Sequence, residues 1–181
     1  PGDATLAWTA AASQSWLNLS HTGGNLAPGA TVTVTAALSG AANTLPVGAY
    51  HDAVLFTNTS TGRGTTSRNA DLMVRPAAPV LAAEPPVTGG TSNTISWSPV
   101  AGATEYEAQA ANNTGFTSPL TSGWIAGTSH TFTSLANGST WYFRVRARQS
   151  VAGTTGSWTQ TTQTDFDGDT KVAVSTTSAG E

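Results

Sequence analysis

The feature that most constrains the fold is an alternation of apolar and polar side chains with a period of two. Residues 31–35 read Thr-Val-Thr-Val-Thr, which places Val32 and Val34 on one face and the threonines on the other. Clusters of Gly, Pro and Asn interrupt this alternation roughly every 8–12 positions, the spacing of turns in a sandwich or barrel. No stretch has the spacing of an amphipathic helix. The sequence therefore predicts an all-β fold, with strands in its first half at residues 5–8, 15–20, 31–38, 49–58 and 66–74.

A short proline-rich segment divides the chain. Residues 75–79 read Arg-Pro-Ala-Ala-Pro, and proline cannot donate a ladder hydrogen bond. We interpret this segment as a linker and expect three parts: a sandwich at 1–76, a second sandwich at 77–163, and an acidic tail at 164–181. The strands predicted for the second sandwich are 80–84, 94–98, 104–111, 123–126, 130–133, 141–148 and 157–162.

Composition excludes several classes of protein. There is no Cys, so disulfides and cysteine-based metal or redox sites are ruled out. The net charge is −3 and only 9% of residues are charged, so no basic surface for nucleic acid is expected. No apolar run approaches the roughly 20 residues of a membrane span. The bias toward Thr, Ser, Ala and Gly fits a secreted bacterial protein, and the start at Pro1 suggests a chain that has been processed or cut from something longer.

Two stretches of the second half carry a family resemblance. They are TISWSPVAGATEYEAQA, beginning at Thr94, and SLANGSTWYFRVRA, beginning at Ser134. Together they resemble a fibronectin type III domain covering residues 79–163. The resemblance implies a buried Trp97 and an inward-facing Tyr106. Trp141 stands where that family has a tyrosine whose hydroxyl closes a corner; either the indole N–H replaces that bond, or the alignment shifts by one to Tyr142.

Two rows of charged side chains accompany these strands. Arg144, Arg146 and Arg148 alternate with apolar residues, and Glu105, Glu107 and Gln109 do the same on an earlier strand. If the two strands are neighbours, as the resemblance implies, the rows face each other and pair at about 0.2–1 kcal/mol per pair. The alternative, an anionic-ligand site on the arginines, is less favoured.

The first half is similar to a BACON-type module, an immunoglobulin-like sandwich appended to bacterial and phage secreted proteins. The matching features are Trp16-Leu17, the Gly24 to Gly29 turn, LPVGAY from Leu45 and FTN from Phe56. The resemblance covers residues 4–75. It implies a role in carbohydrate or mucin binding, or as a spacer.

The six tryptophans divide into two groups. Two small cysteine-free domains need large buried side chains, and each buried aromatic removes about 150–250 Å² from water. We therefore place Trp8, Trp16, Trp97 and Trp141 in the cores. Trp124 and Trp158 lie near strand ends and are the candidates for a ligand platform that stacks on sugar rings.

The acidic tail resembles the opening of a VCBS or FG-GAP repeat, a calcium-binding unit of some β-propellers. Asp165, Asp167 and Asp169 match the alternating acids of that loop, with Gly168 at its turn. A later acid is missing, so three carboxylates would form an incomplete cage for Ca²⁺, which prefers six to eight oxygens. These aspartates are the candidate metal ligands. The alternative is an Asp-rich turn leading to a further strand at 171–175.

No catalytic site is predicted. The histidines are scattered, and no serine lies in a G-x-S-x-G turn. Neighbouring His51 and Asp52 would point to opposite faces of a strand. Glu105 and Glu107 lie on one side of a strand beside arginines, which indicates a structural role.

The sequence thus predicts a non-catalytic binding or spacer region of a secreted or cell-surface protein, bacterial or phage-associated, with a role in adhesion or in association with extracellular glycan. Its partners would be other domains of a larger chain or neighbouring subunits. Two alternatives stay open. One is a subunit of an extracellular filament or surface array that lends its apolar C-terminal strand to a neighbour. The other is the ancillary carbohydrate-binding region of a secreted enzyme.

Overall fold

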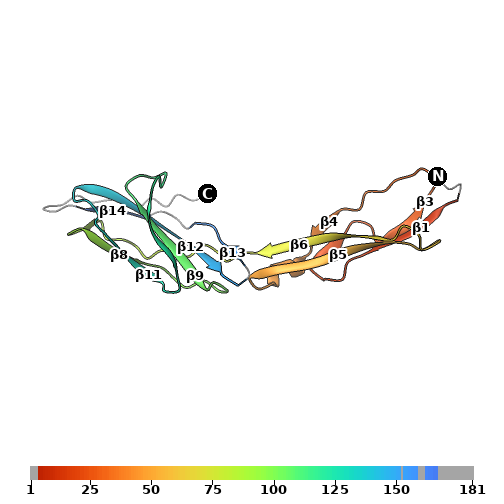
Figure 1. The fold of residues 1–181 in the computed structure, drawn as a ribbon, viewed down its shortest axis with the longest axis horizontal. Helices are drawn as coiled ribbons and strands as arrows, with labels where there is room; N and C mark the ends of the chain where they lie inside the picture. The colour runs from red at the N-terminus through yellow and green to blue at the C-terminus, as the bar shows by residue number, and fades with distance from the viewer. Residues whose placement is uncertain (1–3, 152, 159–161, 167–181) are drawn as a thin grey trace. The chain divides into compact units, whose positions relative to one another are not determined.

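The chain folds into two compact units, the first module (Pro1–Val74) and the second module (Arg75–Glu181). The computed structural model describes residues 4–151, 153–158 and 162–166. Within this part all regular structure is β-strand except for one 3₁₀ turn, so the predicted all-β fold is confirmed (Figure 1).

The first module is built on a four-stranded antiparallel sheet in the order β3-β1-β5-β6. A second, two-stranded sheet pairs β2 with β4, and η1 connects β4 to β5. The elements are β1 (Leu6–Ala11), β2 (Leu17–Leu19), β3 (Gly23–Leu26), β4 (Ala36–Leu38), η1 (Gly40–Thr44), β5 (Gly48–Asn58) and β6 (Thr66–Val74). The long β5–β6 hairpin pairs Gly48 with Val74 at one end and Phe56 with Thr66 at the other.

Two local expectations for this module are wrong. The adjacent glycines Gly23 and Gly24 predict a turn from the sequence, yet they begin strand β3. They lie against β1, where a Cβ on residue 23 would lie 2.8 Å from the Trp8 carbonyl oxygen. The predicted strand at 31–38 is also shorter, since only Ala36–Leu38 pairs as β4. Strand β2, its partner, ends at Leu19, so regular pairing stops there.

The second module has one large sheet in the order β10-β9-β12-β14-β7, with β13 pairing at the end of β12. Strands β8 and β11 form the opposite sheet, extended by a bridge between Leu81 and Trp97. The elements are β7 (Val87–Thr88), β8 (Ser92–Ser96), β9 (Glu105–Ala111), β10 (Leu120–Ile125), β11 (Ser129–Thr133), β12 (Ser139–Gln149), β13 (Thr154–Thr155) and β14 (Thr162–Phe166).

The boundaries of the second module differ from those expected. The last strand of the described residues lies at Thr162–Phe166 instead of 157–162. It pairs with β12, so Thr164 to Phe166 belong to this sheet rather than to a separate tail. At the other end, Pro79 of the expected linker is fully buried, and the Val80 carbonyl accepts from the Ser98 amide at 2.9 Å.

Each module buries its own core, as the placement of the tryptophans predicted. Trp97 is 5% exposed within a cluster that includes Ile95, Tyr106 and Phe143. Trp8 centres the cluster of the first module, and Trp16 is buried as well. Trp141 is half-buried and packs against the second core.

The corner beside Trp141 resolves the alternative left by the sequence. The Trp141 indole N–H donates to the Ser139 hydroxyl at 2.8 Å, and that hydroxyl donates to the Ala136 carbonyl. The indole N–H therefore reaches the backbone through a serine, and Tyr142 is not needed for the corner.

Candidate functional site

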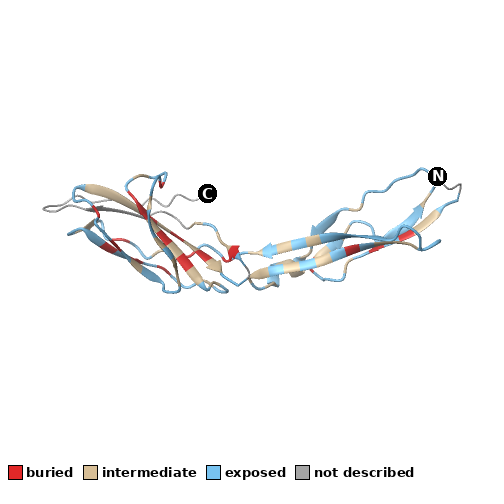
Figure 2. Ribbon diagram, viewed as in Figure 1, coloured by how far each residue is buried: buried red, intermediate tan, exposed pale blue. Residues whose placement is uncertain are grey.

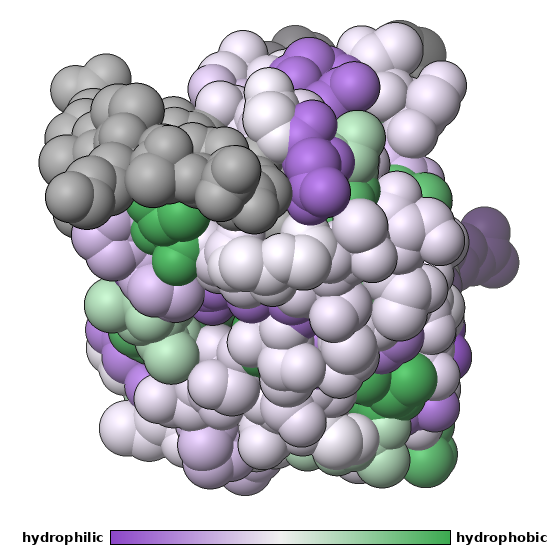
Figure 3. Space-filling model, turned by 90° about the vertical axis from the view of Figure 1, so that its left-hand side faces the viewer, coloured by the Kyte–Doolittle hydropathy of each residue, from purple (hydrophilic) through white to green (hydrophobic). Residues whose placement is uncertain are grey.

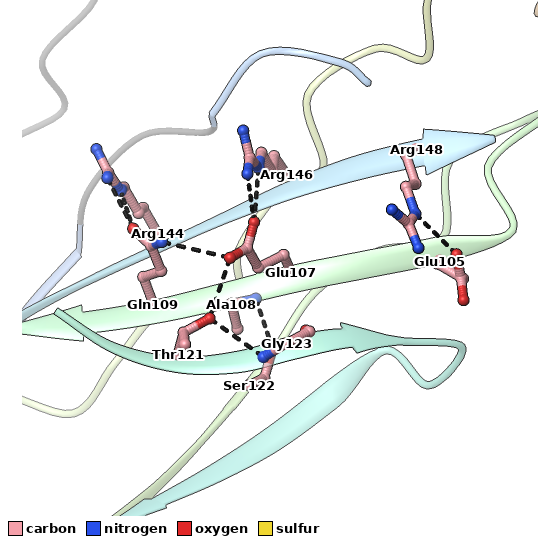
Figure 4. Close-up of polar contacts among 10 residues, drawn as sticks. All are labelled: Glu105, Glu107, Ala108, Gln109, Thr121, Ser122, Gly123, Arg144, Arg146 and Arg148. Atoms are coloured by element: carbon pink, nitrogen blue, oxygen red, sulfur yellow. Dashed lines mark hydrogen bonds and ion pairs between the residues drawn. The ribbon is translucent and has the colours of Figure 1, made fainter. Parts of the chain in front are cut away.

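The most densely connected polar face of the described chain lies on β9 and β12 of the second module (Figure 4). These strands are neighbours, with Arg144 opposite Gln109, Arg146 opposite Glu107 and Arg148 opposite Glu105. Because side chains alternate along a strand, the three arginines share the face opposite the core. The predicted pairing of the two charged rows is confirmed.

The pairs are held by short hydrogen bonds. Arg146 donates from Nε and Nη2 to Glu107 Oε2 at 2.8 and 2.5 Å, and Arg148 donates from Nε to Glu105 Oε2 at 2.8 Å. Glu107 is only 12% exposed and also accepts from the Thr121 hydroxyl of β10 at 3.1 Å. This carboxylate is therefore satisfied by groups of two neighbouring strands.

Arg144 differs from the other two arginines because its cross-strand partner is uncharged. Its Nε and Nη2 donate to Gln109 Oε1 at 2.9 and 2.7 Å. Burial, followed by repulsion from Arg146, lowers the pKa of Arg144 from its usual value, while Glu107 opposes the change. The two carboxylates thus compensate two of three guanidinium charges on this face.

Aromatic rings lie between the guanidinium groups. The Arg144 guanidinium carbon is 4.1 Å from the ring centroids of both Phe116 and Trp158. Arg146 lies 4.4 Å from the Trp158 centroid and 5.1 Å from that of Trp124, and Arg148 lies 4.2 Å from Trp124. We call these three arginines and three rings the arginine–aromatic ladder.

The ladder joins segments that are distant in the sequence. Phe116 comes from the β9–β10 connection, Trp124 from β10, and Trp158 from the segment after β13. Each cation–π contact is worth about 0.5–2 kcal/mol, depending on desolvation. The ladder therefore fastens the β10 edge and the segment before β14 onto the centre of the sheet.

The two tryptophans predicted as a ligand platform, Trp124 and Trp158, belong to the arginine–aromatic ladder. Trp124 and Trp158 lie on the same face, each next to two guanidinium groups. The Trp158 ring lies within 4.4 Å of the guanidinium carbons of both Arg144 and Arg146, so much of its surface contacts charged groups of the module itself. Both rings are half-buried. Sequence reasoning did not anticipate Phe116 or the stacking, although three arginines at every second position were the available signal.

The candidate calcium ligands fall largely outside the described residues. Asp165 lies in β14, where its backbone pairs with Thr140 and Val87. Asp167 and Asp169 are not described, so calcium binding stays a prediction. Among residues 4–151, 153–158 and 162–166 there is no group of three His, Cys, Asp or Glu residues placed to hold a metal ion.

His51 and Asp52 contact different elements, as expected. The His51 Nδ1 lies 2.6 Å from Asp71 Oδ1 on β6, and both side chains are well exposed. Asp52 instead accepts from the Gln14 and Ser13 amides at 3.0 and 3.1 Å, and these bonds, that from Gln14 first, lower its pKa. Asp52 therefore orders the turn after β1.

The first module contains a groove that the sequence did not suggest. Its volume is about 610 Å³, and its lining is mainly apolar. The apolar wall and floor consist of Leu6, Trp8, Leu26, Val32, Val34 and Phe56, and Arg63 is the charged residue that lines it. The groove lies where the strand predicted at 31–38 fails to pair along its first half.

In the part of the chain that the structure describes, no helix is long and apolar enough to cross a membrane. The surface of the face shown in Figure 3 is mostly of intermediate hydropathy, and strongly apolar and strongly hydrophilic residues form small separate patches.

Comparison with known proteins finds a family similarity for the first module. Residues 1–69 match the family described as "Viral BACON domain". No curated protein matches the sequence.

Several solved structures are similar to the chain. A two-domain fibronectin type III segment of chicken tenascin is 13% identical, with a TM-score of 0.46, over 88% of this chain and 81% of that one. The FN1–FN3 domains of chicken CNTN1 are 12% identical (TM-score 0.43; 90% of this chain, 56% of that one). The twitchin kinase region of C. elegans is 20% identical (TM-score 0.43; 53% and 17%). The chain spans less than two thirds of the last two proteins, and likenesses at this level say nothing about function.

The fold of the second module is described from its own strand order and buried residues. Strands β10, β9, β12 and β14 form one sheet, β8 and β11 the other, and Trp97 and Tyr106 are buried between them. This is the arrangement that the fibronectin type III resemblance implied. Residues 1–69 are therefore similar to the viral BACON family, and the second module has the two-sheet arrangement and buried residues that the fibronectin type III resemblance implied.

Proposed function

We propose that the chain is a non-catalytic binding and spacer region of a secreted or surface-exposed multidomain protein, bacterial or phage-associated. The observation that carries the proposal is the arginine–aromatic ladder. Its rings, together with the carboxylates of Glu105 and Glu107, contact the guanidinium groups from within the module, and these contacts stiffen the sheet. A region that holds other domains apart needs stiff modules whose charged side chains are paired within the module.

The match of residues 1–69 to a viral BACON family supports the surface location. Beyond spacing, we propose that the second module adheres weakly to extracellular glycan. The contact would be made by Trp124 and Trp158 together with Arg144. Arg144 favours acidic sugars, because its partner Gln109 leaves its charge uncompensated.

The test is a glycan array that includes sialylated, uronic-acid and sulfated glycans, combined with product analysis of the same glycans after incubation. We expect weak binding to acidic glycans without turnover. Replacing Arg144 with Gln should abolish that binding, whereas replacing the exposed Arg68 of the first module should not. Cleavage of any glycan would contradict the non-catalytic proposal, and silence across the array would leave only the spacer role.

A further inference from the structure

The segment between β3 and β4 has the sequence of a strand but makes no strand contacts. Residues 31–34 read Thr-Val-Thr-Val, and they are assigned to no strand. Within the described part of the chain, their backbone N–H and C=O groups form no hydrogen bond. Regular contact resumes only at Thr35, whose carbonyl accepts from the Ser20 amide at 2.9 Å. We call residues 31–34 the open segment.

The open segment borders the groove of the first module. Val32 and Val34 line the groove together with Trp8 and Phe56. Val32 is 40% exposed, and Val34 is half-buried. Since alternate residues of a strand share a face, both valines can contact the groove while Thr31 and Thr33 face away.

Such a segment is a template for strand addition. Proteins protect exposed strand edges with charge, proline or bulges, and the open segment has neither a charge nor a proline. An added strand would satisfy the free backbone groups and place its own alternate side chains over the groove.

We propose that the open segment of one copy accepts residues 171–175 of a second copy as an added strand. This stretch reads Lys-Val-Ala-Val-Ser, so as an added strand it would present Val172 and Val174 on one face, which matches the apolar groove. It belongs to residues 167–181, which follow the last strand of the second module.

Charge agrees with this occupant. Lys171 lies at one end of the stretch, and no other charged residue occurs before Glu181. The incoming side chains would therefore bring no charge over Trp8 and Phe56. The inference goes beyond the proposed function, because it assigns self-association to the first module and glycan contact to the second.

The experiment is sedimentation velocity on the full chain over a wide concentration range. Wild type is expected to associate with increasing concentration. Val174→Asp on the donor and Val32→Lys on the acceptor should each yield monomers. Val32→Lys should fold, since the side chain is already 40% exposed. The matched controls are Ala173→Asp, on the opposite face of the donor, and Val80→Lys, which changes a valine that is 68% exposed in the second module; both should associate as wild type does.

Mixing the two monomeric variants gives the decisive result. Val174→Asp retains its acceptor and Val32→Lys retains its donor, so together they should form a one-to-one dimer that neither forms alone. Monomers at every wild-type concentration, undiminished association of Val174→Asp, or no dimer in the mixture would each overturn the proposal. Glycan binding of the Val32→Lys monomer should equal that of wild type, which separates this result from the fate of the proposed function.

Discussion

The two modules use the same alternation of side chains but close their cores to different degrees. Among the described residues, the first buries four apolar side chains, Trp8, Ala10, Trp16 and Val54. The second buries a longer set that includes Ile95, Trp97, Phe132, Leu135, Phe143 and Val145 (Figure 2). In the first module, the sheet opposite β1 and β5 consists of two three-residue strands. The comparison shows that alternation of side chains specifies a sandwich. The length of the strands in the smaller sheet determines how many side chains are buried between the two sheets.

The largest difference should appear on truncating a core aromatic in each module. Phe143→Ala should cost about 3–5 kcal/mol, the usual range for a large aromatic lost from a core. Phe143 is fully buried and packs against Phe132. Phe56→Ala should cost only about 1–2 kcal/mol, because a half-buried ring removes less apolar area from water. That ring lies beside the groove. Urea unfolding of the full chain, followed by tryptophan fluorescence, measures both. Equal losses would show that the cores are equally closed.

A smaller effect should follow from removing one arginine in each module. Arg146→Met should cost about 2 kcal/mol, because a poorly exposed carboxylate loses its main partner and two ring contacts disappear. The carboxylate is that of Glu107, and the rings are those of Trp124 and Trp158.

The matched change in the first module is Arg68→Met. It should alter stability by less than about 0.5 kcal/mol, as is usual for a surface substitution. Arg68 is exposed and bonds only its neighbours. Chemical denaturation compares the two variants. Adding Glu107→Met to Arg146→Met should restore part of the loss. A loss unchanged in the double variant would mean that the ring contacts account for the effect.

Two carboxyl groups should give the modules opposite responses to pH. In the second module, Glu84 is 8% exposed, and burial raises its pKa above 4.5, although Asn93 donates to it. The folded state then binds the proton more tightly, so this stabilisation is complete below the unfolded pKa and is lost as the pH rises through the folded pKa. Glu84→Gln should therefore be stabilising at pH 7, with no gain in acid below the unfolded pKa.

Asp52 of the first module should behave in the reverse way. Hydrogen bonds from Gln14 and Ser13 lower its pKa below 3.8. Its contribution is therefore present above the unfolded pKa and is lost as the pH falls through the folded pKa. Asp52→Asn should be destabilising at pH 7 and neutral in strong acid. Denaturant titrations of both variants from strong acid to neutral pH, relative to wild type, give the two signs. Parallel pH curves would contradict the contrast.

The smallest effect concerns an imperfection of the better-packed module. The Thr154 hydroxyl is fully buried and has no hydrogen-bond partner in the described part of the chain. Thr154→Val keeps the shape and should raise the free energy of unfolding by about 1 kcal/mol. Thr94→Val is the control, because it removes the hydroxyl contact to Thr131 at 2.7 Å and should not stabilise. Thermal unfolding of both variants, relative to wild type, measures the two effects. A destabilised Thr154→Val would show that this hydroxyl has a partner.

Much of the second module followed from the sequence because its signals are local. Alternation at Arg144 to Arg148 and at Glu105 to Gln109 indicated which faces are polar, and the family motifs placed the two strands side by side. The ladder did not follow, because Phe116, Trp124 and Trp158 come from three separate connections and strands, whose meeting depends on the folded sheet.

The sequence by itself determined the all-β class, two Trp-centred cores and the pairing of opposite charges. A period of two and the placement of large apolar residues are properties of neighbouring positions, so they can be read without a structure. Only the tertiary structure decided that residues 31–34 stay unpaired, that Gly23 packs on β1, and that Trp158 lies between two arginines. Each of these depends on which segments distant in sequence come together, and on where a partner strand ends, which no local pattern records.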